Sequence, residues 1–426
     1  MSFQGRQYCV PFCLSPGQFR VCTYAVALFS TALFLLVIQG CFSPKRLPAV
    51  PDSLTATAII PGIPNARFWV NSIQGIDSIL KYALEMRSRE KRELSRMGHQ
   101  GPLPPVNFLA ISGGGDKGAF SAGLLVGWGE AGNRPSFEVV TGISTGALIA
   151  PFAYVGSEYD QTLKTFYTNI GPDDIYNNRN LLLAFFNDAL RDSTPLWNLV
   201  KKNVNEELLE RIAEKYDKGP SLFVATTNLD ARLPVLWNMG EIAASNDPKS
   251  LELFRKILLA SASIPGIFPP VMIDVEVDGA SYQEMHVDGG ATAQVYLFPT
   301  SLGSTIRDKG LWIERERTAY IIRNARLDPD WASIDRRTLS ILGRAISSLT
   351  QTQGVGDLYQ IYLNARHNNM DFNLAFIDPD FDVEHKEEFD TEYMRALFDY
   401  AYQLAREGYP WQKTPPGLLD TDLEVE

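Results

Sequence analysis

Ser144 stands in the pattern G-x-S-x-G, which could supply the nucleophile of an acyl-transfer reaction. Residues 142–146 read Gly-Ile-Ser-Thr-Gly and lie between an apolar segment, which predicts a strand over 137–141, and an apolar helix that starts near Ser144. Glycines on both sides of the serine remove side chains that would collide where a strand turns sharply into a helix. The start of the helix would favour a developing negative charge, and the amide of Thr145 could bind it.

A glycine-rich run precedes this motif and could bind an anion. Residues 111–118 read I-S-G-G-G-D-K-G, follow an apolar segment that starts at Val106, and open a predicted helix over about 117–130. The run matches G-x-G-x-x-G, but Glu138, the acid that follows at roughly the right spacing, opens the next strand instead of ending it, where a ribose contact would lie. Consecutive glycines at a helix start expose amides to an anion. The run alone fits a pyrophosphate or a transition-state oxyanion.

A serine nucleophile needs a base, and two residue types could provide it. In the chain order of an α/β-hydrolase triad the base would be His367 or His385. His367 ends a long helical pattern, and His385 lies in an acidic run that is typical of a solvated surface. Asp288 is the other candidate, because it ends a short predicted strand and is followed by Gly289 and Gly290, which allow close backbone approach. The same D-G pair is also common in turns.

The composition describes a globular protein and excludes some classes of function. The 426 residues are 45% hydrophobic and 21% charged, and 50 acidic residues outnumber 39 basic ones, which argues against a nucleic acid as the main partner. All four cysteines lie at or before Cys41. The rest of the chain therefore has no thiolate metal site, disulfide framework or cysteine nucleophile.

Strand and helix patterns alternate from Val106 onward and predict an α/β fold. Further strands are expected over 222–226, 234–238, 319–323 and 372–377, and helices over about 77–97, 249–262, 335–364 and 390–406. This alternation predicts a mostly parallel sheet covered by helices on both faces. The Pro-rich stretch over 42–66 is expected to form an extended tether or a surface strap.

The N-terminus resembles a bacterial lipoprotein signal. Arg6 and Arg20 precede the apolar, uncharged run over 21–38, and I-Q-G-C ends at Cys41, which would carry the lipid and become the mature N-terminus. An uncleaved signal anchor is the alternative, since a run of this length can just cross a bilayer. Phe42, which stands where an aspartate would signal inner-membrane retention, favours the periplasmic side of a bacterial outer membrane.

Membrane attachment by net charge is not expected. Cleavage before Cys41 would remove two arginines and no acid, so the formal net charge of −11 would become more negative. Anionic lipid would repel such a body as a whole. Attachment must then rest on acyl chains or on a local apolar patch.

Together, the three glycine-bearing patterns resemble the patatin-like phospholipase family. The order is strand, G-G-G-x-K-G and helix, then G-x-S-x-G, then D-G-G. Two further segments are similar to segments of the family, S-A-S-I-P-G-I-F-P-P over 261–270 and A-T-T-N-L-D over 225–230. The resemblance covers about 106–295, and the ordered signature is far more specific than any one of its parts.

The resemblance implies roles for particular residues. Ser144 would be the acyl-accepting nucleophile and Asp288 the base of a Ser–Asp dyad, provided that burial raises the pKa of Asp288. Further motif positions are Gly142, Gly146, Gly289 and Gly290. The residues implied for the oxyanion hole are Gly113, Gly114, Gly115, Asp116, Lys117, Gly118 and Thr145.

The implied protein is a three-layer α/β hydrolase that cleaves lipid esters through an acyl-enzyme, with phospholipase A or lysophospholipase-like activity. No metal or cofactor is expected; the expected partners are a lipid or membrane substrate and the membrane that holds the lipid anchor. The expected organisation is a signal over 1–40, a tether and helical strap over 41–105, a catalytic core over 106–300 and a completion of the same domain over 301–426. The alternatives are an inactive lipid-binding or scaffold lipoprotein and a nucleotide-binding protein.

Overall fold

The computed structural model describes residues 45–70, 73–179, 187–329 and 331–418. Contacts divide the chain into two units, and everything described below belongs to the larger one, Arg46–Arg179 with Ala189–Glu426. The predicted signal over 1–40 and the predicted lipidation site Cys41 lie outside the described residues. Within the described ranges, no helix is both long enough and apolar enough to cross a membrane.

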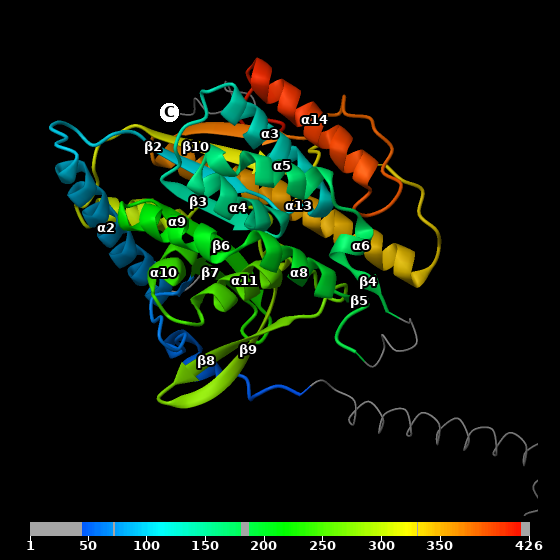
Figure 1. Ribbon diagram of the computed structural model, residues 1–426, viewed down its shortest axis with the longest axis horizontal. Helices are drawn as coiled ribbons and strands as arrows, with labels where there is room; N and C mark the ends of the chain where they lie inside the picture. Colours follow the sequence, from blue (N-terminus) through cyan, green and yellow to red (C-terminus); the bar gives the residue numbers. More distant parts are fainter. Residues whose placement is uncertain (1–44, 71–72, 180–186, 330, 419–426) are drawn as a thin grey trace, which may run out of the picture. The chain divides into compact units, whose positions relative to one another are not determined.

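In the described part of the chain, a nine-stranded sheet forms the centre of this unit (Figure 1). Five neighbouring strands, in the order β6-β3-β2-β10-β11, run parallel, and β7 and β1 continue the sheet beyond β6 as antiparallel neighbours. The strands are β1 (Arg67–Trp69), β2 (Val106–Ile111), β3 (Val139–Ile143), β6 (Ser221–Asn228), β7 (Leu233–Asn238), β8 (Val271–Val277), β9 (Ala280–Asp288), β10 (Arg317–Arg323) and β11 (Asp371–Phe376). The predicted α/β fold with a mostly parallel sheet is confirmed.

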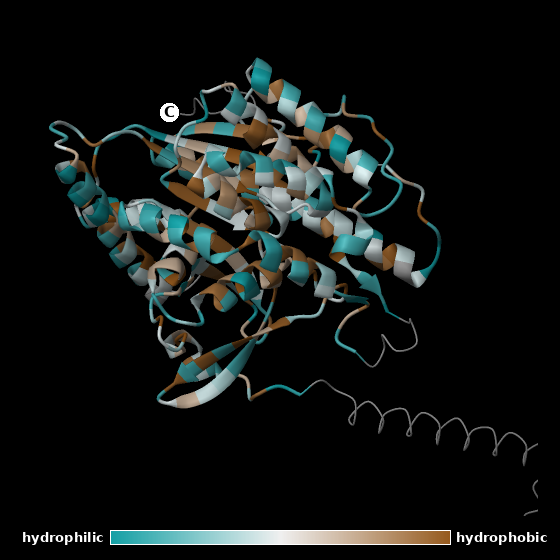
Figure 2. Cartoon of the chain, viewed as in Figure 1, coloured by the Kyte–Doolittle hydropathy of each residue, from teal (hydrophilic) through white to brown (hydrophobic). Residues whose placement is uncertain are grey.

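Helices cover both faces of the sheet and bury its two apolar surfaces. One layer packs α3 (Gly118–Glu130), α4 (Thr145–Val155) and α14 (Thr391–Glu407) against side chains such as Val140 and Leu222. The other packs α2 (Ile73–Arg96) and α12 (Thr300–Asp308) against Val139 and Phe223, and α13 (Thr338–His367) against β10 and β11. Successive strand residues point to opposite faces, so adjacent valines belong to different layers. Figure 2 shows the apolar strands between helices of mixed hydropathy.

Shorter helices complete the layers and one small strand pair lies apart from the central sheet. The helices are α5 (Asp160–Thr168), α6 (Pro172–Ile175), α8 (Thr194–Asn203), α9 (Glu206–Asp217), α10 (Met239–Ala244) and α11 (Ser250–Ser261). The separate pair is β4 (Asn177–Asn178) with β5 (Arg191–Asp192).

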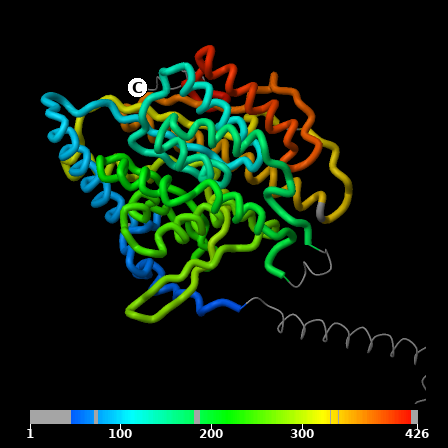
Figure 3. Tube along the Cα trace, in the orientation of Figure 1, coloured from blue at the N-terminus to red at the C-terminus, as the bar shows by residue number. Residues whose placement is uncertain are grey.

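Helices α3 and α14 lie side by side although they are far apart in the sequence (Figure 3). Gly123 and Gly127 of α3 face α14, and a Cβ at either position would overlap the main-chain carbonyl of Phe398 or Tyr402. Residues four apart share one face of a helix, so the two glycines let the backbones approach closely. This contact fixes α14 over the helix that follows the glycine-rich turn.

Two strands end against the same edge of β6 and meet head to head. β3 runs parallel to β6 and its last pair is Ile143 with Ala225, whereas β9 runs antiparallel and its last pair is Asp288 with Thr226. β7 occupies the other edge of β6 over these residues. Since a strand has only two edges, β3 and β9 must share one, and their carboxyl ends are neighbours.

The described part of the Pro-rich stretch is a packed strap and not a free tether. It contains the 3-10 helix η1 (Asp52–Thr57) and forms main-chain hydrogen bonds with β8, between Ile59 and Glu276, of 3.0 and 2.9 Å. Ile60 and Ile63 are buried by this packing. Only the last strand of the β8–β9 hairpin that receives the strap is among the predicted elements.

Most predicted elements are present with shifted bounds. The helix predicted over 335–364 is α13, and the strand predicted over 137–141 is β3. β3 begins at Val139; Glu138 just before it donates from its amide to the carbonyl of Asn107 (2.9 Å), near the start of β2, and its carboxylate accepts a hydrogen bond of 2.6 Å from the amide of Asn107. Sequence patterns do not predict α5, α8, α9 or α12.

A buried charged network joins β1, β9 and β6. Glu284 forms an ion pair with Arg67, its Oε2 lies 3.0 Å from Nε2 of His286, and Nδ1 of that ring lies 2.8 Å from the Thr226 hydroxyl. Burial alone would raise the pKa of Glu284, but the charge of Arg67 and the hydrogen bonds outweigh burial and lower it to about 2. Burial lowers the pKa of His286, so a neutral ring that donates from Nε2 fits both of its partners.

Glu284→Gln should leave the guanidinium of Arg67 buried and unpaired, and should lower the free energy of unfolding by about 3 kcal/mol at pH 7. Because the folded-state pKa of Glu284 is lowered, its contribution is complete above its ordinary pKa of 4.5 and is lost as the pH falls towards 2. Urea denaturation at pH 7 and pH 3 measures both effects. Glu276→Gln on β8 is the matched control and should cost less than about 0.5 kcal/mol. Equal costs for the two variants would contradict this role of the network.

Candidate active site

Ser144 occupies a strained turn between β3 and α4. Its φ of 55° and ψ of −124° lie in a region that residues with a Cβ seldom adopt. A Cβ at Gly142 would overlap the carbonyl of Gly146, and one at Gly146 would overlap the carbonyl of Ile111. The two glycines of the motif are therefore required by close backbone contacts, as the nucleophile-elbow pattern predicts.

The serine backbone is held by hydrogen bonds from outside the motif. The Ser144 amide donates to the hydroxyl oxygen of Ser261 (3.0 Å), and that hydroxyl donates to the carbonyl of Ala225 (2.7 Å). Ser261 is the last residue of α11, and Ala225 lies on β6. The strained turn is thus tied to two neighbouring elements.

Asp288 ends β9 beside this turn, close enough for the Ser144 hydroxyl to affect its pKa. Only 4% of Asp288 is exposed, and its Oδ1 accepts a hydrogen bond of 2.7 Å from the amide of Gly290. Burial raises the pKa of Asp288 to about 6, against the opposing effects of the Ser144 hydroxyl and the Gly290 amide. A carboxylate with such a pKa can accept a proton from a serine far better than an ordinary aspartate can.

The glycine-rich turn presents amides beside Ser144. A Cβ at Gly113 would come within 3.1 Å of the Cβ of Ser144, and a Cβ at Gly114 would overlap the carbonyl of Asn324, so this turn tolerates only glycine there. Gly115, with a φ of 62°, begins the 3-10 helix η2 (Gly115–Lys117), where amides have no acceptor within the helix. The amides of Gly114 and Gly115 are therefore placed to bind an oxyanion.

Not all residues implied for the oxyanion hole have a free amide. The amide of Gly113 donates to the carbonyl of Gln294 (3.0 Å), and that of Gly118 donates to carbonyls in η2. Thr145 is the first residue of α4, so its amide points out from the start of the helix. Its hydroxyl oxygen lies 2.5 Å from the hydroxyl oxygen of Tyr167. The structure thus narrows the expected set of donors.

Asp116 has a different role from the one the sequence suggests. Its buried Oδ2 accepts hydrogen bonds from Nε2 of His385 (2.6 Å) and from the amide of Phe389 (2.8 Å). The hydrogen bond with Asp116 raises the pKa of His385. His385 is exposed, as its acidic surroundings predict, but its ring reaches the Asp116 carboxylate and, with Lys117, lines the cleft above Ser144. The Asp116 carboxylate on the glycine-rich turn thus holds the His385 ring at the cleft.

Three residues beyond the motifs hold the glycine turn in place. Asn324, directly after β10, donates from its side chain to the carbonyl of Ser112 (2.9 Å) and receives a hydrogen bond from the Ser121 hydroxyl (2.6 Å). Gln294, which holds Gly113, donates from its amide to the carboxylate of Asp357 on α13 (2.6 Å). No sequence motif marks these residues, because their types are common and their partners are distant in the chain.

A cleft of about 780 Å³ opens above Ser144 and Asp288. Its volume lies within the range of about 300–1,000 Å³ that small-molecule sites usually have. Apolar side chains contribute much of the wall, among them Ile264, Phe268, Ile346, Leu349 and Phe389. His367, the other histidine considered as a base, is exposed at the end of α13 and does not line this cleft. The cleft suits an apolar substrate that bears an ester at the serine.

A serine on a strained turn, a buried carboxylate beside it and adjacent glycine amides form an arrangement that fits a serine hydrolase with a Ser–Asp dyad. The sequence comparison agrees with this class. Residues 109–298 match the model of the family described as patatin-like phospholipase. The family implies action on lipid esters.

The remaining comparisons are with curated sequences and with solved structures. No curated protein has a significantly similar sequence. Among solved structures, VipD from Legionella pneumophila is similar at 13% sequence identity and a TM-score of 0.34, over 71% of this chain and 67% of that one.

The pKa of Asp288 predicts the acidic limb of the pH–rate profile. The group must be ionised to accept the serine proton, so kcat/KM for a soluble p-nitrophenyl ester should fall about tenfold for each pH unit below about 6. The control is His385→Gln, which should keep the limb, because the His385 ring is not the base. If the limb disappears in His385→Gln, the base has been misassigned.

Proposed function

We propose that this protein is a lipid acyl hydrolase that cleaves carboxylic esters, of the phospholipase A or lysophospholipase type, through an acyl-enzyme on Ser144. The observation that carries the proposal is the placement of Ser144, on a strained turn, beside the buried carboxylate of Asp288, whose pKa burial raises and the Ser144 hydroxyl lowers. A serine on a structural turn would need neither the strain nor a partner with a raised pKa.

The proposed reaction has two halves. The Ser144 oxygen attacks the ester carbonyl while its proton passes to Asp288, and the amides of Gly114 and Gly115 bind the resulting oxyanion. Collapse of this intermediate breaks the ester bond, and Asp288 returns the proton to the departing alcohol. Water then attacks the acyl-enzyme and gives a proton to Asp288, and Asp288 passes this proton to the Ser144 oxygen as the fatty acid leaves.

Exposed apolar side chains at the rim of the cleft support a lipid substrate. The amino-terminal part of α13 and the residues before it expose Trp331 (87%), Ile346 (54%) and Leu349 (71%), and the last two also line the cleft. Over 331–350 three arginines accompany a single aspartate, in a chain whose formal net charge is −11. An apolar surface with a local positive charge suits an anionic lipid surface.

Membrane attachment through Cys41 is part of the proposal and rests on the sequence alone. The lipoprotein-type signal would deliver the hydrolase, exported, to the periplasmic side of an outer membrane, with an uncleaved anchor as the alternative. Acyl labelling of Cys41 would test this placement.

Labelling with a fluorophosphonate should modify Ser144, because the dyad makes this serine a nucleophile. Ser144→Ala and Asp288→Asn should each lower kcat for a p-nitrophenyl ester by about a thousandfold or more. Mass spectrometry of the labelled peptide and initial rates measure the two effects. Ser304→Ala on α12 is the control and should behave as the wild type. Equal rates for all four proteins would favour an inactive lipid-binding or scaffold protein instead.

The exposed apolar side chains should matter only for lipid that is assembled in a surface. Trp331→Gln combined with Leu342→Gln should reduce hydrolysis of phosphatidylglycerol vesicles about tenfold and leave hydrolysis of a soluble p-nitrophenyl ester unchanged, since neither residue lines the cleft. Leu363→Gln, an equally exposed position near the other end of α13, is the matched control and should have no effect. A loss of activity shared by both substrates, or by both variants, would count against this surface.

A further inference from the structure

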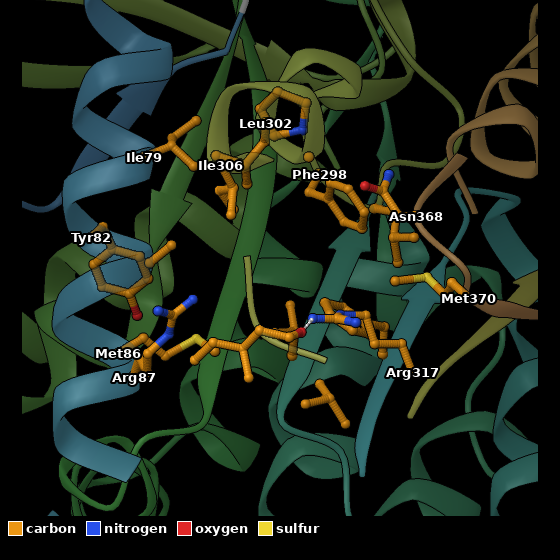
Figure 4. Close-up of a pocket in the computed structure, with 18 of the residues that line it drawn as sticks. Ile79, Tyr82, Met86, Arg87, Phe298, Leu302, Ile306, Arg317, Asn368 and Met370 are labelled. Atoms are coloured by element: carbon orange, nitrogen blue, oxygen red, sulfur yellow. Dashed lines mark hydrogen bonds between the residues drawn. The ribbon is translucent and has the colours of Figure 1, made fainter. Parts of the chain in front are cut away.

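A second cavity, of about 180 Å³, lies between α2, α12 and the sheet (Figure 4). Ile79, Tyr82 and Met86 approach it from α2, and Leu302 and Ile306 approach it from α12. Voids larger than a water molecule are few in protein interiors, and an engineered apolar cavity of about 150 Å³ binds benzene. The cavity is therefore large enough to hold part of an apolar ligand.

This cavity is separate from the catalytic cleft. It shares no lining residue with the cleft in the part of the chain that the structure describes. Val106, Val139 and Arg317, which line it, are the first residues of β2, β3 and β10, whereas Ser144 follows the last residue of β3. At about 3.3 Å per residue, Val139 and Ser144 lie roughly 16 Å apart along β3. A ligand in one does not occupy the other.

The inner walls of the cavity are apolar. Phe68, Ile79, Leu297 and Met370 are buried, and the strands and helices contribute further aliphatic and aromatic side chains. Asn368 also lines the cavity, but its Oδ1 is directed at Gly303 of α12, where a Cβ would overlap it. Water has few partners on such walls, so an apolar chain is the occupant that suits them.

The opening of the cavity is positively charged. Arg87 and Arg317, on opposite sides in Figure 4, are partly exposed. Arg315 also lines the cavity and is paired with Glu90 at 2.7 and 3.0 Å. The guanidinium groups of Arg87 and Arg317 donate to main-chain carbonyls, including that of Leu311 at 2.9 Å from Arg87.

Guanidinium groups outnumber the carboxylates at this opening. Burial lowers the pKa values of Arg87 and Arg317, and the charge of Arg315 lowers both further. Glu90 compensates only one of the three charges, and Glu314 adds a weaker attraction for Arg317. An anion placed between Arg87 and Arg317 would relieve this repulsion.

We propose that the cavity binds a free fatty acid, with its acyl chain against the apolar walls and its carboxylate between Arg87 and Arg317. A two-chain phospholipid is too large for a cavity of about 180 Å³, since drug-sized ligands need roughly 300 Å³ or more. The site goes beyond the proposed hydrolysis and does not depend on Ser144. A fatty acid is also the acid that this hydrolysis would release, so occupancy would rise as product accumulates.

Calorimetric titration of the Ser144→Ala protein with decanoate, below its micelle concentration, tests the proposal without turnover. We expect one saturable site, at least tenfold weaker binding in Arg87→Gln/Arg317→Gln, and no detectable site in Ile306→Trp, whose larger side chain would fill the cavity. Arg211→Gln/Arg406→Gln, on the exposed faces of α9 and α14, removes the same charge elsewhere and should bind as tightly as the parent. Decylammonium, with the same chain and a positive head, should not bind.

Several results would overturn this assignment. They are equal affinity for decanoate and decylammonium, undiminished binding in Ile306→Trp, and loss of the site when Ser144 of the wild-type protein carries a fluorophosphonate. If Arg87→Gln/Arg317→Gln fails to fold in a thermal-melting check, the comparison of head groups and Ile306→Trp still decide. A protein that binds decanoate as expected but hydrolyses no ester would refute the proposed function and leave this site standing.

Discussion

The shared edge of β6 is the constraint on which the site depends. β3 arrives along this edge in one direction and β9 in the other, and both stop where the two strands meet. A nucleophile and a base that are distant in the sequence are thereby brought side by side by main-chain pairing, which is stiffer than any loop. The strain at Ser144 and the burial of Asp288 both follow from this meeting, because two chain ends must turn away within one layer of the sheet.

Local motifs predicted the positions of the serine and the aspartate because each depends on neighbours in the chain. The glycines around Ser144 and after Asp288 are required by contacts within a few residues or with one adjacent strand. Such local requirements produce short motifs that can be recognised in the sequence. The burial that raises the pKa of Asp288 could only be stated as a condition, since it depends on how β9 packs.

The supports of the site could not be predicted, for a physical reason. Asn324, Gln294 and Asp357 act through single hydrogen bonds between segments that are far apart, and an asparagine or glutamine occurs in many solvated loops. His385 is the clearest case. Its acidic neighbours are typical of a surface, yet one buried carboxylate, Asp116, places it at the catalytic cleft. The β8–β9 hairpin is different, because V-M-I-D-V-E-V in β8 alternates over seven residues and so carried a strand signal that the sequence prediction missed.

β2 lies inside the sheet, between β3 and β10, and this position limits how far the matched region can be separated from the rest of the chain. The matched region, 109–298, excludes β10 and β11, and without them β2 would be a bare edge strand with unsatisfied main-chain groups. It also excludes Asn324, Asp357 and His385, which brace the glycine turn. The stretch that carries the chemical signature is therefore not a transplantable unit. Recombination or truncation that respects only the motifs would preserve every named catalytic residue and still lose the scaffold that aligns them.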